Sequence, residues 1–197
     1  MTGAIRTIVA VLAAAAALYA MQRTTPVYSE ITSPVRTNGQ QGKRVETRNF
    51  AIGIAKVHLA RSIDAPKSGR PHSYTTSGVW VIVEAAVQAT NESLSLTAAE
   101  WLGPDGTRYS MSQRLSTLPG TPGTEQLEPG VPRPMLMIFE VPESQLSGAT
   151  LLVSQSAYTP LSEEAAVAMT EVQTDDIRPV ITIKRGGGTL PWVLEAE

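Results

Sequence analysis

The chain has 197 residues, which is enough for one folded domain with appended segments. Only 5% of the residues are aromatic and 17% are charged, while 15 glycines and 14 prolines favour short strands joined by many turns over a helical enzyme. A net charge of −2 without any Lys/Arg cluster excludes the electrostatic footprint of nucleic-acid binding. The absence of cysteine excludes disulfides, thiol catalysis and Cys-ligated zinc.

The first segment, residues 1–22, is predicted to be a signal anchor or a signal peptide. Residues 8–21 are almost wholly apolar, and Arg6 and Arg23 flank them. Cleavage among the alanines at 15–17 or after Ala20 would release the protein. Retention would leave a membrane helix with its N-terminus inside, although the uncharged run is slightly shorter than the ~20 residues that span a bilayer comfortably. We favour the anchor over a cleaved signal.

Residues 23–49 are predicted to be a flexible linker, because they are mostly polar and show no sustained periodicity. A short first strand around Val27, Tyr28 and Ile31 is left open. The folded domain is predicted to cover residues 50–185.

The central element of this domain is the stretch Gly78–Asn91. Its odd positions from Val79 to Ala89 are all apolar, and alternation in a Val-rich run predicts a β-strand with one face in a core. The even positions begin with Trp80 and Ile82 and then turn polar from Glu84 onward. We therefore expect the second face to be covered at one end and solvated at the other.

An earlier strand is predicted at residues 50–63, with a change of phase in its apolar positions. Phe50, Ile52 and Ile54 share one parity, and Val57 and Leu59 share the other. Both sets can face one core only if an extra residue is inserted, so a β-bulge is predicted near Ala55 or Lys56. His58 would then point away from the core, beside Lys56.

The segment that follows, residues 64–77, is predicted to be a loop by its Pro, Gly and Ser content. Lys67, Arg70 and His72 make it locally basic. It is either a recognition loop for an acidic partner or headgroup, or a solvated connection, which we favour.

Further strands are predicted in the middle of the chain. Gly103-Pro104-Asp105-Gly106 has the residues of a type I turn and predicts a β-hairpin in which Trp101 and Tyr109 pack. Residues 113–133 form a long Pro- and Gly-rich loop that is either functional or disordered. Strands are then predicted at 135–141 and 149–154.

The C-terminal part is predicted to hold a short helix, a strand and a tail. Ser162 followed by two glutamates resembles a helix N-cap, so a helix is expected to run to about Thr170. A last strand begins near Ile177, and Pro179 places its start at a sheet edge. Residues 186–197 form a tail whose Trp192 docks on a partner or, as we favour, folds back on its own domain.

Three segments in this order resemble a known group of proteins. They are GVWVIVEAAVQATNESLSL, WLGPDGTRYS and LEPGVPRPMLMIFEVP, and together they resemble the bacterial extracytoplasmic immunoglobulin-like domains of unknown function, which are similar in fold to secreted immunoprotective antigens of mycobacteria. The resemblance covers about residues 50–156 and departs from the group in the long 113–133 loop and the C-terminal part. It implies a sandwich and an envelope address, and it supplies no catalytic residues.

The expected fold is therefore all-β: an immunoglobulin-like antiparallel β-sandwich, preceded by one N-terminal apolar helix and carrying a short helix in its C-terminal part. The expected location is the bacterial inner membrane, with the domain facing the periplasm or exterior, or secretion after signal cleavage. We expect a membrane contact through residues 8–21 and an unknown envelope protein or glycan as partner.

Three functions are weighed. The first is non-catalytic protein or glycan interaction through a surface that consists of Lys67, Arg70, His72, Asp105 and Trp192. The second is a secreted hydrolase with His58 or His72 as base, which the absence of a G-x-S-x-G turn disfavours. The third is calcium binding through Asp105, whose turn role already explains it. No catalytic, cofactor-binding or metal-binding residue is assigned.

Overall fold

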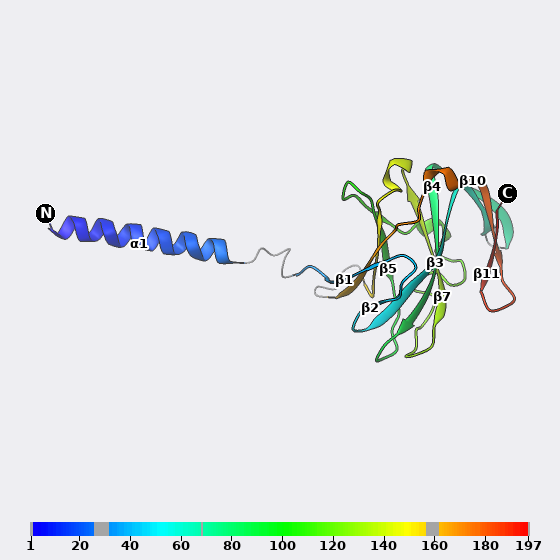
Figure 1. Cartoon of the computed structure of the whole chain (residues 1–197), viewed down its shortest axis with the longest axis horizontal. Helices are drawn as coiled ribbons and strands as arrows, with labels where there is room; N and C mark the ends of the chain where they lie inside the picture. Colours follow the sequence, from blue (N-terminus) through cyan, green and yellow to red (C-terminus); the bar gives the residue numbers. More distant parts are fainter. Residues whose placement is uncertain (1, 26–31, 68, 157–161, 197) are drawn as a thin grey trace. The chain divides into compact units, whose positions relative to one another are not determined.

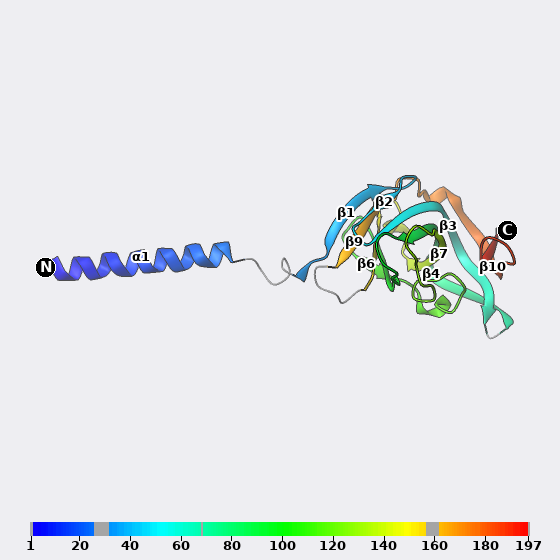
Figure 2. The same cartoon turned by 90° about the horizontal axis from the view of Figure 1, so that it is seen from below.

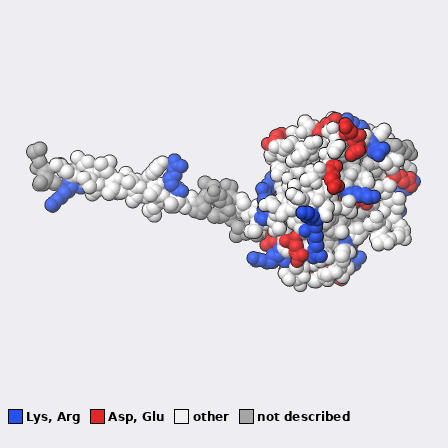
Figure 3. Space-filling model, viewed as in Figure 1, with Lys and Arg blue, Asp and Glu red and all other residues white. Residues whose placement is uncertain are grey.

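The computed structural model describes residues 2–25, 32–67, 69–156 and 162–196, and these divide into two units. The first unit contains one helix, α1 (Thr2–Thr24), whose described side chains are all exposed. Its Gly3–Thr24 stretch is long and apolar enough to cross a membrane by length and composition, a test that a signal sequence also passes. The helix surface is uncharged between basic residues near its two ends (Figure 3).

The second unit, residues 34–197, is a β-sandwich of two mixed sheets (Figures 1 and 2). The first sheet has the order β1-β9-β8-β5-β6, with bounds β1 (Val35–Gln40), β9 (Glu163–Ala168), β8 (Thr150–Ser154), β5 (Ala98–Leu102) and β6 (Arg108–Ser110). The second has the order β11-β10-β3-β4-β7, with bounds β11 (Trp192–Ala196), β10 (Ile177–Arg185), β3 (Phe50–Lys67), β4 (Arg70–Ala89) and β7 (Arg133–Val141). The two-residue strand β2 (Val45–Glu46) pairs with β3.

The expected sandwich is confirmed, but it is not purely antiparallel. Strand β1 pairs with β9 in parallel, and β10 pairs with β3 in parallel. The domain also begins earlier than residue 50, because β1 and β2 lie within the segment that was predicted to be a linker. The strand left open around Val27, Tyr28 and Ile31 lies outside the described residues.

Strand β4 is an interior strand of the second sheet, as its alternation predicted. It pairs with β3 on one side and with β7 on the other. Its odd side chains from Val79 to Ala89 are buried in the core between the sheets, together with Phe50, Leu96, Trp101, Phe139 and Leu151. Period-two alternation thus correctly identified the face that packs against the first sheet.

The predicted bulge is present, and it keeps both halves of β3 in that core. The β3–β4 register shifts between Ile54 and Lys56. Phe50, Ile52 and Ile54 therefore face inward before Ala55, and Leu59 faces inward after it. The bulge also places Lys56 and His58 on the outer face of the sheet, across from Glu84 and Ile82.

The segment predicted to be a basic loop is instead a continuation of β3 and β4. Lys67 pairs with Arg70 and Pro66 pairs with Pro71, so only two residues connect the strands, and the second, Gly69, has φ +78°. The pair next to the closing pair of such a turn has its backbone N–H groups directed away from the partner strand, so prolines are tolerated there. The prediction of a loop at residues 64–77 was therefore wrong, because it relied on Pro, Gly and Ser content alone.

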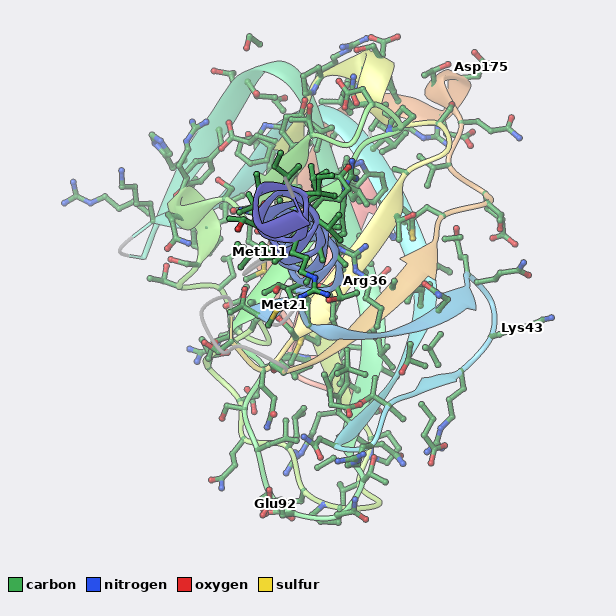
Figure 4. The ribbon with its side chains drawn as sticks, turned by 90° about the vertical axis from the view of Figure 1, so that its left-hand side faces the viewer. Met21, Arg36, Lys43, Glu92, Met111 and Asp175 are labelled. Atoms are coloured by element: carbon green, nitrogen blue, oxygen red, sulfur yellow. The ribbon has the colours of Figure 1, made fainter. Side chains whose placement is uncertain are left out.

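A second register break bends this ribbon. The pairing jumps from Ala60–Trp80 to Ser62–Thr75, so four residues of β4 oppose Arg61 alone. Beyond the break the ribbon carries its tip away from the sandwich layers (Figures 2 and 4), and β10 pairs with β3 up to Asp64. Gly78 lies in the bend, where an added Cβ would meet the Val141 carbonyl oxygen at 2.5 Å.

The bent ribbon helps to form a second core on the outer face of the β3–β4–β7 sheet. Trp80, Ile82, Leu136 and Ile138 provide the sheet surface, and the cover is provided by Ile63, Tyr74, Leu115, Leu118, Ile181, Ile183 and Trp192. The first part of the long 113–133 loop thus lies over this face, whereas Leu127 in its second part belongs to the core between the sheets. The Arg114 guanidinium lies 5.2 Å from the ring centre of Trp80 within this cover.

Two further predictions for the C-terminal part are corrected. The expected helix from Ser162 is strand β9, because Ala165 and Val167 share a parity that faces the core and β1 and β8 pair on both sides. Tertiary pairing overrides the local N-cap signal. The expected tail contains the strand β11, which pairs with β10 and buries Trp192 to 2% exposure, so it folds back on its own domain, the alternative favoured from the sequence.

Candidate functional site

The second core ends at Glu84, and the candidate site begins there. Glu84 is the only acidic residue of β4 and follows Trp80 and Ile82 on the outer face. Opposite it in the register is Lys56, directly after the bulge at Ala55. Bulges are frequent beside functional sites because they redirect side chains. Here the bulge turns two basic residues, Lys56 and His58, toward a single carboxylate.

Glu84 uses both of its carboxylate oxygens in hydrogen bonds. His58 Nε2 lies 2.7 Å from Oε1, and the Trp192 indole Nε1–H donates to Oε2 at 3.0 Å. Because an ionised carboxylate only accepts, the imidazole donates its Nε2 proton. The hydrogen bond from His58 is the main cause that lowers the pKa of Glu84 below 4.5, against the opposing effect of burial. Glu84 is therefore a fixed anion that joins β3, β4 and β11.

Two shallow hollows, open to solvent, adjoin this carboxylate. One has a volume of about 440 Å³ and extends toward the turn between β10 and β11, and the other has about 350 Å³ and extends toward the start of β7. Both are lined by Lys56, Glu84, Thr189, Leu190 and Trp192. We call the two hollows together the outer groove. Each is in the size range of ligand sites.

The outer groove has an apolar floor and a basic rim. Ala55, Ala86 and Pro134 line its second hollow, and Leu190 projects beside them with 44% of its surface exposed. Lys56 and Arg133 are the cations of the same hollow. This is the end of the β4 outer face that was predicted to be solvated. The face of the sandwich drawn in Figure 3 shows both charge signs interspersed. The groove is defined by its shape and its apolar lining.

The residues predicted from the sequence to form an interaction surface do not come together. Lys67 and Arg70 close the tip of the bent ribbon, and the His72 ring packs edge-on against Tyr74 with centroids 4.6 Å apart. Trp192 is buried beside Glu84 and cannot offer its ring to a partner. Within the described residues no hydrogen bond or ion pair links any of the three basic residues to Asp105.

Asp105 has a structural role in the turn between β5 and β6. Its Oδ1 accepts the Thr107 backbone N–H at 2.8 Å, and its Oδ2 accepts from Gln145 Nε2 at 3.0 Å. The bond from the Thr107 backbone is the main cause that lowers the pKa of Asp105. Across the described part of the chain, no group of three or more His, Asp or Glu side chains is arranged to hold a metal ion.

Sequence reasoning placed His58 and Lys56 on the outward face but missed their partners. The position of Glu84 could have been used to find the site. An acidic residue that follows apolar residues on one face of a strand indicates where that face ceases to be buried. Trp192 and Leu190 carried no such signal, because their position depends on β11 returning alongside β10. Arg133 was assigned to the end of a loop rather than to a strand beside the site.

Comparison with known proteins adds limited information. No protein-family model matches the chain, and the search of curated proteins gave no match. Two crystal structures are similar: an uncharacterised β-sandwich protein from Clostridium difficile 630 (15% identity, TM-score 0.39, 68% of this chain and 95% of that chain) and the yjhA protein from Bacillus subtilis (10% identity, TM-score 0.46, 66% and 99%). Their identity and TM-scores are too low to carry a functional inference.

Proposed function

We propose that this protein is a membrane-tethered, non-enzymatic module of the bacterial envelope that binds another protein through the outer groove. The observation that carries the proposal is an open apolar hollow whose wall is fixed in place. The Glu84 bonds to His58 and Trp192 hold the β10–β11 turn beside the floor of β4. A preformed wall reduces the ordering cost of binding, as in other ligand sites.

The use of Glu84 supports a binding role rather than a catalytic one. A general base must reach a proton on the reacting group, and its partner carboxylate must orient it. His58 donates through Nε2 to Glu84, whose second oxygen accepts from Trp192. Among the described residues no Ser, Thr or Tyr hydroxyl is hydrogen-bonded to His58, so the pair has no nucleophile to activate and serves as a brace between strands. Its geometry is also the one observation in favour of a hydrolase, so catalysis is the second candidate.

The chemistry of the exposed apolar residues supports a protein partner over a glycan. Sugar rings pack well against exposed aromatic faces. In the described part of the sandwich the large exposed apolar side chains are all aliphatic: Val35, Val131, Leu190 and Val193. Leu190 and Val193 line the groove, and Val131 is next to the lining residue Pro132. Aliphatic and proline surfaces suit the side chains of a polypeptide.

Helix α1 supports the proposed tether. Its apolar run with Arg6 before it fits a signal anchor with the N-terminus in the cytoplasm, which would place the sandwich in the periplasm or outside the cell. Signal cleavage would give a secreted form of the same module. We further propose kinship with the bacterial immunoglobulin-like domains, supported by the order along the chain of β4, the Asp-Gly hairpin and β7, which ends at Val141 before Pro142.

Photo-crosslinking in intact cells of the native host tests the binding role. A photoreactive residue replaces Ala86 or Leu190 in the groove, and Lys43 serves as the control because it projects away from the sandwich (Figure 4). Probes at Arg70 and Asp105 test the surface first expected from the sequence. We expect a discrete protein adduct from Ala86 and Leu190 only. An adduct from Arg70 or Asp105 alone would reject the groove, and a glycan or no adduct at any position would reject a protein partner.

A further inference from the structure

We propose that the outer groove receives an extended peptide segment that combines apolar side chains with acidic ones, and that Lys56 and Arg133 bind its carboxylates. This inference rests on the proposed function and deepens it by naming the chemistry of the partner. It is based on two basic side chains beside the groove that form no ion pair within the described part of the chain.

Most arginines of the sandwich outside the groove are already paired with acids. Arg36 binds Glu164 at 2.6 Å, Arg61 binds Glu143 at 2.6 Å, and Arg108 binds Glu100 at 2.7 Å. Among the described residues neither Lys56 nor Arg133 forms an ion pair. Both line the same hollow.

Glu84 does not satisfy Lys56, although the two residues are opposite each other in the register. The carboxylate accepts hydrogen bonds from His58 and Trp192, which occupy one oxygen each. Lys56 lowers the pKa of Glu84 through its charge alone, as the smallest of the contributing causes. The ammonium group therefore remains exposed at the rim with its hydrogen-bond donors available. An anion beside it would gain charge-assisted hydrogen bonds.

The apolar floor of the groove favours a ligand that also has an apolar group. Ala55, Ala86, Pro132 and Pro134 present small aliphatic surfaces, and Leu190 stands over them. A free inorganic anion would leave this surface in water. A ligand that places an apolar group on the floor and a carboxylate at the rim uses both features at once.

The shape of the groove favours an extended segment. The two hollows share Thr189, Leu190 and Trp192, and their remaining lining differs: one continues along the start of β7 and the other along the β10–β11 turn. A continuous occupant of both must be longer than a single side chain and thin enough for a shallow channel. An extended chain meets this need, and its side chains alternate between floor and solvent.

Selection from a peptide library tests the inference directly. A phage-displayed library of short random peptides is selected against the full chain held in detergent micelles, and recovered peptides are synthesised with a fluorophore for anisotropy titration. We expect enriched sequences that combine Asp or Glu with Leu, Ile, Val or Pro. Replacing their acids with the matching amides should weaken binding about tenfold, since a lost charge-assisted hydrogen bond is of that size.

Matched variants locate the binding site. Lys56→Gln and Arg133→Gln should each weaken the same peptides about tenfold, and added salt should weaken binding to the unmodified protein. Lys43→Gln is the control, because Lys43 is also exposed and projects from the turn between β1 and β2. It should leave the affinity unchanged.

Several outcomes would overturn the inference. They are no enrichment, enriched peptides without acids, and equal binding by Lys56→Gln, Arg133→Gln and Lys43→Gln. Binding of sodium oleate that depends on Lys56 and Arg133, without peptide enrichment, would replace the peptide with a fatty acid. The two proposals fail separately: a protein adduct from Ala86 whose contact segment carries no acid removes the acidic peptide and leaves the protein-binding role intact.

Discussion

The indole Nε1–H of Trp192 donates a hydrogen bond of 3.0 Å to a carboxylate oxygen of Glu84, 108 residues earlier in the chain. The two residues belong to β11 and β4, which are not neighbours in the sheet. Through this contact Trp192 packs against the outer face of β4, although β11 itself is an edge strand of the sheet. The same contact forms one wall of the outer groove, so the stability of the second core and the shape of the groove depend on one another.

Removing the indole donor should destabilise the protein. Trp192→Phe keeps most of the apolar surface but leaves one half-buried oxygen of Glu84 without its donor, which costs about 1–3 kcal/mol. Urea unfolding of the full chain in detergent micelles measures the loss. Glu84→Gln in the Trp192→Phe background should cost less than it does alone, because the two residues are directly coupled. Strictly additive losses would show that the contact contributes nothing.

The stability of the sandwich should fall in acid partly because of Glu84. Its pKa in the folded protein lies below the ordinary value of 4.5, mainly through the hydrogen bond from His58. The stabilisation by the ionised carboxylate is therefore complete above about pH 4.5 and is lost as the pH falls through the lowered pKa. Glu84→Gln should lack this part of the pH dependence of the unfolding free energy. Glu92→Gln, in the exposed turn after β4 (Figure 4), should keep it.

The bend of the β3–β4 ribbon should depend on the small size of Gly78. A Cβ at this position would meet the Val141 carbonyl oxygen at 2.5 Å, so Gly78→Ala forces backbone movement and should cost about 1–3 kcal/mol. Gly53→Ala is the matched control within β3, because its Cβ would meet nothing within 4 Å. It should be neutral or slightly stabilising, since Gly is unfavourable inside strands by about 0.5–1 kcal/mol. Equal thermal stability of the two variants would contradict the close approach.

Deleting the bulge residue Ala55 should prevent correct folding. Without it, the strand can keep either Phe50, Ile52 and Ile54 or Leu59 in the core, but not both sets. We expect loss of the cooperative unfolding transition and of near-ultraviolet circular dichroism. Deleting Gly187 should be tolerated much better, because it is exposed and lies in the turn between β10 and β11, outside any strand register. A folded and stable Ala55 deletion would show that the register can be repaired elsewhere.

A charge in the middle of α1 should weaken the proposed membrane tether. Leu12→Arg places a guanidinium at the centre of the apolar stretch, where insertion scales assign a cost of about 2.5–3.5 kcal/mol. Alkaline extraction of isolated membranes should retain the unmodified protein and release more of the variant. Mass spectrometry of the membrane-bound form should find the intact N-terminal segment. A mature protein that begins after Ala20 would instead establish signal cleavage.

The sequence was most informative wherever the physical cause was local. Alternation from Val79 to Ala89 revealed the central strand and the change of phase at Ala55 revealed the bulge, because strand geometry ties both directly to side-chain direction. The turn at Gly103–Gly106 was equally local, since Pro, Asp and Gly each occupy the position they favour.

The errors arose where distant partners decide the structure. Ser162 and the glutamates after it carry a helix-start signal, yet β1, more than 120 residues earlier, and β8 hold this segment as a strand. The groove could not be predicted from the sequence for the same reason. The position of Glu84 follows from its own strand, but Trp192 contacts it from another part of the sheet. Pro66 and Pro71 suggested a loop because composition does not show which N–H groups need a partner.

The parallel pairing of β1 with β9 also sets an order of folding. Val35 pairs with Glu163, so β1 has no ladder to join until almost all of the other strands exist. The β3–β4 ribbon and β7 can assemble from near neighbours, whereas both mixed sheets close only through contacts between remote segments. Such non-local closure is slow, on a scale of about milliseconds to seconds, and leaves β9 with an open edge in the meantime. The segment that leads into the sandwich should therefore be among the last parts to dock.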